Sequence, residues 1–275
     1  MIRQLPAALF LVAAIAIGVL TNSYDEIVAG AFGAIVGSFL NVCIHRLPRR
    51  TSIVWPASAC PDCKRELDWF ENLPIASYLV LRGRCRTCRK PISIRYPIVE
   101  AVTAAMFVAA WWFYGPGVLF VSRLVLGCAL IVLFEIDREH QILPHAITLP
   151  GIVIGFAFSF FTDPGWISSL VGILVGGGTL LAIGYGYYLI RHEEGLGMGD
   201  FKMLAMIGAF LGWQLTIVTL MMASFAGSIL GVALIASKRG GLKSALPFGT
   251  FLAIGAAVAA AVGPQLIDWY LGRFA

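Results

Sequence analysis

Residues 117–137, GVLFVSRLVLGCALIVLFEID, are apolar over nearly their whole length and then end in two acids. A run of about 20 such residues is long enough to cross the hydrocarbon core of a bilayer as a helix. The whole chain has the same character, because 59% of its 275 residues are hydrophobic, 13% are charged and the mean hydropathy is +0.85. This composition excludes an ordinary soluble domain and predicts an all-α polytopic membrane protein.

Apolar runs of spanning or near-spanning length recur along the chain, so we expect about eight to nine transmembrane helices. The runs cover about residues 6–22, 27–44, 98–114, 117–137, 146–162, 166–190, 203–212, 215–236 and 247–271. The run 203–212 is too short to cross a membrane by itself, so a span there would have to include the residues on either side of it. The first run is expected to be a retained helix, although a signal segment would have the same pattern.

The distribution of Lys and Arg sets the orientation, because these residues are retained on the cytoplasmic side of a membrane. Residues 45–97 hold more than half of the 20 Lys and Arg residues, whereas the connections TNSYDE, YGPG and TDPGW contain none. The chain therefore divides into an additional N-terminal apolar helix (1–26), a transmembrane helix (27–44), a cytoplasmic loop domain (45–97) and a transmembrane domain (98–275). The basic residues are explained by topology, so no nucleic-acid partner is expected.

The loop domain carries two cysteine pairs, Cys60-Pro-Asp-Cys63 and Cys85-Arg-Thr-Cys88, which are separated by 21 residues. Paired CxxC knuckles at this spacing are typical of a tetrahedral zinc site with four thiolate ligands. A reducing compartment argues against disulfides. We expect Cys60, Cys63, Cys85 and Cys88 to bind a structural zinc ion that folds this loop, with a redox role as the alternative.

Two acids, Asp137 and Asp200, stand where apolar runs meet the predicted cytoplasmic face. Asp137 ends one run, and Asp200 begins another after the glycine-rich stretch 195–199. Two carboxylates that met there would share a proton, so that one acts as a base toward water and the other as an acid toward a carbonyl oxygen. That is aspartic-protease chemistry. Because Asp200 begins a helix and Asp137 ends one, we expect Asp200 to hold the negative charge and Asp137 the shared proton.

Several short motifs follow one another along the chain. Besides the two CxxC pairs they are GSFLNVCIHRLP (37–48), WFENLPIASYL (69–79), RYPIVE (95–100), IDREHQILPH (136–145) and GMGDFK (197–202). This ordered series closely resembles the bifunctional type IV prepilin peptidases, which are aspartic endopeptidases of the bacterial inner membrane. One departure is His145, where many members of that family have aspartate.

The resemblance implies both an activity and a set of site residues. It implies cleavage of the basic leaders of prepilins and type II secretion pseudopilins after a glycine, at the cytoplasmic face of the membrane. It also implies N-methylation of the new terminus with S-adenosylmethionine. The catalytic pair would be Asp137 and Asp200, and the metal ligands would be the four loop cysteines. No residue is assigned to the S-adenosylmethionine site.

Alternatives to these interpretations remain open at the level of sequence. The glycines at 195–199 are expected to make room for an extended peptide, but they can equally form a simple turn before a helix. An ion-coupled membrane transporter with a metal-sensing loop is the competing class, since intramembrane acids also relay ions. A membrane scaffold whose zinc loop binds partners is a third. Membrane lipid is a partner in every case.

Overall fold

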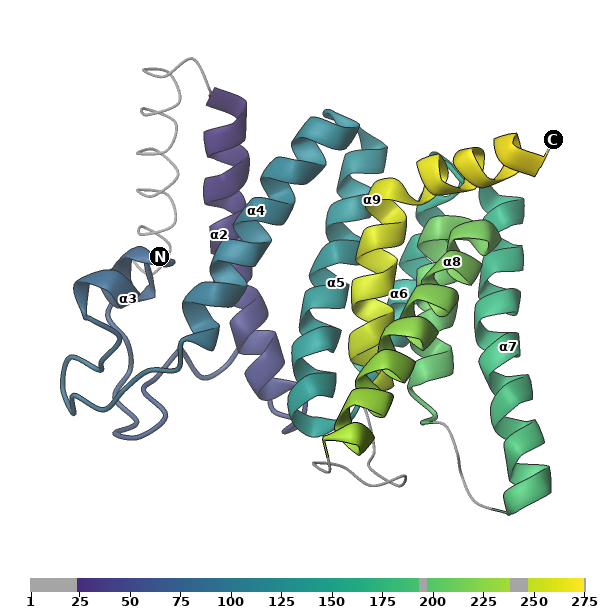
Figure 1. The fold of residues 1–275 in the computed structure, drawn as a ribbon. Helices are drawn as coiled ribbons and strands as arrows, with labels where there is room; N and C mark the ends of the chain where they lie inside the picture. Colours follow the sequence, from purple (N-terminus) through teal and green to yellow (C-terminus); the bar gives the residue numbers. More distant parts are fainter. Residues whose placement is uncertain (1–23, 193–196, 238–246, 275) are drawn as a thin grey trace. The chain divides into compact units, whose positions relative to one another are not determined.

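The structure is a computed structural model that describes residues 24–192, 197–237 and 247–274. The apolar run 6–22 and the start of the 195–199 glycine stretch therefore lie outside the described residues. The chain forms two compact units, Met1–Pro116 and Gly117–Ala275, which we call the N-terminal unit and the C-terminal unit (Figure 1). Each unit is described by itself.

The N-terminal unit is built on two long helices, α2 (Tyr24–Arg46) and α4 (Arg95–Tyr114), which lie side by side and antiparallel (Figure 1). They approach closely because α2 carries glycines on the shared face. A Cβ at Gly37 would lie 2.8 Å from the Cα of Glu100. The loop that connects the two helices contains the short elements η2 (Trp69–Asn72) and α3 (Ala76–Val80).

In its described residues, the C-terminal unit is a bundle of five helices whose core lies between α5, α8 and α9. The helices are α5 (Val118–His140), α6 (His145–Phe158), α7 (Trp166–Arg191), α8 (Asp200–Ala236) and α9 (Phe248–Phe274). Leu133, Met206 and Leu252 are fully buried in this core, each from a different helix.

Across the described ranges, six helices are long and apolar enough to cross a membrane, namely α2, α4, α5, α7, α8 and α9. Helix α6 is apolar but shorter. Within the same ranges the only β pairing consists of two isolated bridges in the loop domain. The expected all-α membrane fold is confirmed, whereas the count of eight to nine spans stays a prediction.

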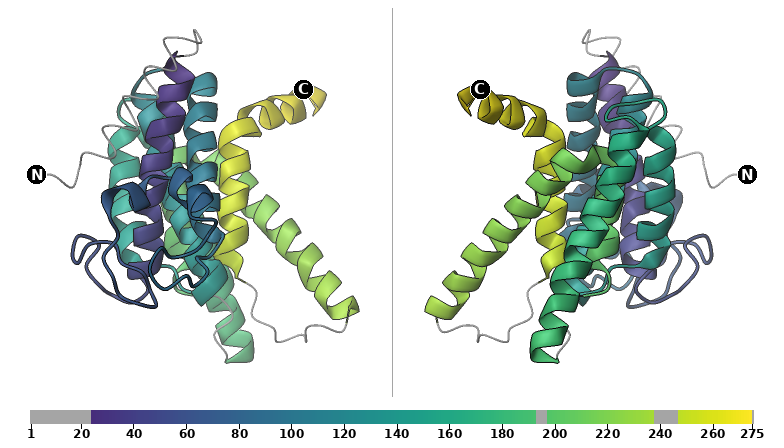
Figure 2. Two further views of the ribbon diagram at one scale, coloured as in Figure 1. Left: turned by 90° about the vertical axis from the view of Figure 1, so that its left-hand side faces the viewer. Right: turned by 90° about the vertical axis from the view of Figure 1, so that its right-hand side faces the viewer.

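Helix α8 joins two of the predicted apolar runs, 203–212 and 215–236, across a sharp break. Gly212 has φ 76° and ψ 173°, a conformation that favours glycine over any residue with a Cβ. The first arm runs antiparallel to α7, with Gly208 against Gly172, while the second arm slopes away from α9 (Figure 2). Residues Met203 to Gly212 are all buried, which explains why this stretch is apolar on every face.

The break would leave the backbone carbonyl groups just before Gly212 without helical partners, and two side chains supply hydrogen bonds to them. Ser169 donates to the carbonyl of Ala209 at 2.7 Å. Arg123 donates to the carbonyl of Phe210 at 2.8 Å. The hydroxyl of Thr216 donates to the carbonyl of Gly212 at 2.6 Å, a bond within the first turn of the second arm. A carbonyl without a partner in hydrocarbon costs several kcal/mol, so these donors make the break tolerable. The arginine inside the α5 run thus has a structural role.

Replacing Arg123 with Met should therefore destabilise the C-terminal unit, because the carbonyl of Phe210 loses its charged donor. The expected loss is about 1.5–3 kcal/mol, the usual range for a hydrogen bond to a charged group. Thermal unfolding in detergent measures the effect. The control is Arg191→Met at the exposed end of α7, and equal stability of the two variants would contradict the assigned role.

Candidate functional site

The two cysteine pairs of the loop domain form a pair of matching knuckles. In the first, the N–H of Cys60 donates to the carbonyl of Arg65, and that of Lys64 donates to Cys60. In the second, the N–H of Cys85 donates to the carbonyl of Lys90, and the N–H of Arg89 donates to the carbonyl of Cys85. The residue after each second cysteine has positive φ, 59° at Lys64 and 57° at Arg89. Each CxxC sequence therefore closes a tight turn with both sulfurs on one side.

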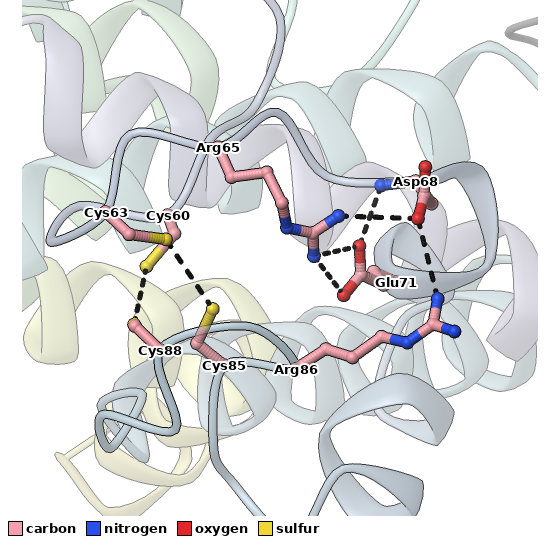
Figure 3. Close-up of polar contacts among 8 residues, drawn as sticks. All are labelled: Cys60, Cys63, Arg65, Asp68, Glu71, Cys85, Arg86 and Cys88. Atoms are coloured by element: carbon pink, nitrogen blue, oxygen red, sulfur yellow. Dashed lines mark hydrogen bonds and ion pairs between the residues drawn. The ribbon is translucent and has the colours of Figure 1, made fainter.

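The knuckles face each other, and their four sulfur atoms converge (Figure 3). All four lie within 4.8 Å of one another, with Sγ–Sγ distances of 3.8 Å for Cys60–Cys88 and 3.9 Å for Cys63–Cys85. A tetrahedral zinc ion with Zn–S bonds of about 2.3 Å would require sulfurs about 3.8 Å apart. The geometry therefore fits a metal ion such as zinc.

Backbone donors prepare part of this cluster for metal binding. The N–H groups of Cys88 and Thr87 point at the sulfur of Cys85 and lower the pKa of that thiol to about 6. A thiolate is the form that binds a metal, so these donors favour Cys85 as a ligand.

A network of ion pairs around Glu71 ties the two knuckles together (Figure 3). Arg65, in the first knuckle, donates to both oxygens of Glu71 at 2.6 Å, and the N–H of Asp68 donates to the same carboxylate at 2.8 Å. Only 2% of the Glu71 side chain is exposed. Burial alone would raise the pKa of Glu71, but these donors lower it below its ordinary value. Glu71 is therefore a buried carboxylate whose negative charge is stabilised by Arg65 and the N–H of Asp68.

Two further ion pairs cross from one knuckle to the other. In the second knuckle, Nη1 of Arg86 lies 3.6 Å from Oδ2 of Asp68, which follows the first knuckle. Nζ of Lys90 lies 2.7 Å from Oδ1 of Asp62, within the first knuckle. Such exposed pairs are individually weak. Together with Glu71 they fix the distance between the two turns.

Three of the sequence motifs meet beside this loop, at the ends of α2 and α4. Asn41 donates from Nδ2 to the carbonyl of Tyr96 at 3.1 Å. The buried carboxylate of Glu100 accepts the N–H of Ile75 at 2.7 Å. Ile75 has φ 59°, an unfavourable value for a β-branched residue, so Glu100 holds a strained turn in place.

In the C-terminal unit, Asp137 lies in the last turn of α5 and is only 5% exposed. Its Oδ2 accepts two hydrogen bonds from Thr250, one from the backbone N–H at 2.8 Å and one from the hydroxyl at 3.1 Å. Thr250 lies in the first turn of α9. A Cβ at Gly249 would lie 3.0 Å from the same oxygen, so glycine lets α9 approach the carboxylate. Sequence reasoning did not identify Gly249 or Thr250.

Asp200 is the first residue of α8 and is partly buried. Leu143, in the turn between α5 and α6, packs close to Gly199 on one side and to Gly249 on the other. The two aspartates therefore lie at the same end of the unit, and they are near enough for their charges to interact.

A second helix terminus bears on which aspartate holds the shared proton. Asp200 begins α8 as expected, but Asp137 receives its hydrogen bonds from the N-terminus of α9. Both carboxylates thus lie at helix N-termini, where negative charge is favoured. The N-terminus of α8 therefore does not by itself show which of the two aspartates holds the negative charge.

His145 begins α6, and its Nε2 lies 3.3 Å from the Nζ of Lys202 in the first turn of α8. This contact joins α6 to the helix that Asp200 begins. An aspartate at position 145 would place an opposite charge beside Lys202, whereas histidine offers a ring nitrogen.

Comparisons with known proteins cover most of the chain. Residues 31–114 match the Bacterial Peptidase A24 N-terminal domain, and residues 124–232 match the Type IV leader peptidase family. A prepilin leader peptidase/N-methyltransferase of Pseudomonas putida is 36% identical, over 89% of this chain and 93% of the relative. A protein of the same description from Aeromonas hydrophila is also 36% identical, over 88% and 92%. One from Myxococcus xanthus is 42% identical, over 77% and 64%. No solved structure matches the chain.

The Glu71 network yields a prediction about metal affinity. Replacing Glu71 with Gln removes the charge that holds Arg65, so the first knuckle should lose its fixed position. We expect metal affinity to fall about 10-fold, at the lower end of the effect of residues that orient metal ligands. Competition with a chromophoric chelator measures this. Glu66→Gln, at an exposed acid of the same loop, is the control, and equal affinities would show that Glu71 does not support the metal site.

Proposed function

The chain belongs to the type IV leader peptidase family, and on that basis we propose that it cleaves the leader peptides of prepilins and methylates the amino terminus that cleavage exposes. The observation that carries this proposal is the similarity to two relatives whose descriptions name both activities. It extends over about nine-tenths of this chain and of each relative. The same similarity favours an enzyme over an ion-coupled transporter or a scaffold. We extend the proposed substrates to the pseudopilins of type II secretion, with cleavage after a glycine.

We propose that Asp137 and Asp200 form the peptidase site. Support comes from their position at one end of the C-terminal unit, on either side of Leu143, with their charges interacting. One ionised carboxylate takes a proton from water, and the oxygen attacks the peptide carbonyl. The other, protonated, carboxyl group gives its proton to the carbonyl oxygen. Transfer of a proton to the amide nitrogen then breaks the C–N bond and releases the leader.

We assign the base role to Asp137 and the acid role to Asp200. Thr250 donates two hydrogen bonds to Oδ2 of Asp137, and donors of this kind favour the charged form of a carboxylate. Within the described part of the chain, the donor to Asp200 is the backbone N–H of Gly197. This assignment reverses the one made from the sequence, and the reason is a helix terminus that the sequence did not reveal.

We propose that the N-terminal unit serves methyl transfer and that its four cysteines hold a structural zinc ion. The sulfur spacing fits that ion. S-adenosylmethionine, when bound, supplies an electrophilic methyl group for the amine of the new terminus. The described part of the N-terminal unit consists of helices and loops. The S-adenosylmethionine site proposed for this unit therefore differs from the site of a doubly wound methyltransferase. No residue is assigned to that site.

The apolar helices make this a multi-pass membrane protein. We propose that it lies in the bacterial inner membrane, with residues 45–97 and both aspartates on the cytoplasmic side. The basic composition of residues 45–97 supports this orientation. A prepilin is an apolar helix with a basic leader, so its cleavage site would lie at the same face of the membrane.

The peptidase assignment predicts selective loss of one activity. Asp137→Asn and Asp200→Asn should each lower cleavage of a synthetic prepilin at least about 100-fold, because each removes one partner of a proton transfer. Methylation of a pre-cleaved peptide by the same preparations should persist and reports that the protein is folded. Asp268→Asn, at an exposed position far along α9, is the control. Full cleavage by either first variant would remove that residue from the mechanism.

The role of Thr250 predicts a change in pH dependence. Thr250→Val deletes the hydroxyl donor, so the ionised form of Asp137 is less favoured and deprotonation needs a higher pH. The acid limb of kcat/KM for cleavage should therefore move up by about 1 pH unit, equivalent to about 1.4 kcal/mol. Thr250→Ser keeps the hydroxyl and should leave the limb in place. A limb that moves equally in both variants, or in neither, would refute the assignment of the base.

A further inference from the structure

Three successive apolar side chains protrude from the loop that follows α2. Ile53, Val54 and Trp55 are 37%, 72% and 68% exposed. They lie outside the apolar helices, in a stretch where an isolated water-facing loop would be expected to carry polar residues. Exposed large apolar groups that gather on one short loop mark an interaction surface.

The loop is held rigidly at the end of a membrane helix. Arg46, the last residue of α2, donates to the carbonyl of Ser52 at 2.9 Å and to that of Pro56 at 2.7 Å. These two carbonyls flank the apolar residues. The hydroxyl of Ser52 also accepts the N–H groups of Val54 and Trp55, at 3.2 and 3.3 Å. The loop is therefore a closed turn with its apolar side chains directed outward.

This tether fixes the depth of the loop in the membrane. Residues Asp25–Arg46 form a candidate span, and an arginine at the end of a span lies in the headgroup layer. Because one guanidinium group contacts both sides of the turn, the three apolar residues lie within a few side-chain lengths of that layer. A Trp with aliphatic neighbours is the composition that favours the boundary between headgroups and acyl chains.

The charge around the loop points to the same partner. Arg49 and Arg50 are exposed and directly precede the turn, and residues 46–60 contain no acid. A positive rim around an apolar tip complements a surface of anionic phospholipids. A wholly apolar partner would cover the apolar tip but leave the two arginines without a counter-charge.

We propose that residues 52–56 insert into the lipid leaflet at which α2 ends, with Ile53, Val54 and Trp55 at the acyl boundary and Arg49 and Arg50 on anionic phosphates. The first metal ligand, Cys60, follows four residues after this turn. The insertion thus anchors the cysteine knuckles on the membrane surface. It restricts the loop domain to the layer in which the amino terminus of a membrane-bound substrate emerges.

Photo-crosslinking of the full-length protein in nanodiscs tests the contact directly. Val54 is replaced by benzoylphenylalanine, and the nanodiscs contain a clickable phospholipid in either phosphatidylglycerol or phosphatidylcholine. Lipid adducts should form at least 10-fold more than from the same probe at Thr87, an exposed polar position of the loop domain. The yield should be higher with phosphatidylglycerol. No excess over Thr87, or adducts to an added pilin in place of lipid, would overturn the proposal.

A second measurement avoids the bulky probe. The emission of Trp55 is obtained by subtracting the fluorescence of the Trp55→Phe variant from that of the unsubstituted protein. Lipids brominated high on the acyl chain should quench this difference signal, and aqueous iodide should not. Quenching by iodide with no effect of the brominated lipids would place Trp55 in water and overturn the proposal. Both assays report on lipid contact alone, so their outcome is independent of peptidase or methyltransferase activity.

Discussion

Hydrogen bonding of backbone carbonyls at the break in α8 is the constraint on which the C-terminal unit depends. A helix that ends inside hydrocarbon exposes carbonyl groups that water cannot reach. Donors from α5 and from α7 satisfy two of them. The first arm can then be a short, fully buried helix at the centre of the bundle. Asp200 begins that arm, so its position follows from where the chain is able to break.

The sequence predicted those parts of the structure that depend on composition and local spacing. The apolar runs after residue 24 correspond to helices, because a helix in lipid needs only a continuous apolar stretch. The two CxxC pairs converge as expected, because each turn is closed by hydrogen bonds between residues five apart. Family resemblance was confirmed by similarity along nearly the whole chain.

Other features depend on contacts between distant residues and could not be predicted. The sequence divides the apolar pattern into the runs 203–212 and 215–236, and the break at Gly212 falls at that division, but the pattern does not reveal that the two arms join at a sharp angle as one element, α8. Thr250 reaches Asp137 across more than a hundred residues, so the assignment of base and acid made from the sequence rested on only one of the two relevant helix termini. Glu71 resembles any surface acid in the sequence, and only its 2% exposure and its contact with Arg65 reveal its role. Long-range packing decided each of these cases.

The length of α6 has a consequence for the lipid around the aspartates. Its 14 residues extend about 21 Å, which is shorter than a hydrocarbon core of about 30 Å. Leu149, Val153 and Ile154 are exposed along it, so this helix presents an apolar face that suits acyl chains. A short apolar element in a bilayer is accommodated by local thinning, by snorkelling of flanking residues or by association with other helices. Thinning at the His145 end would bring phosphate groups and water nearer to the turn at Leu143, beside the two aspartates proposed for the peptidase site.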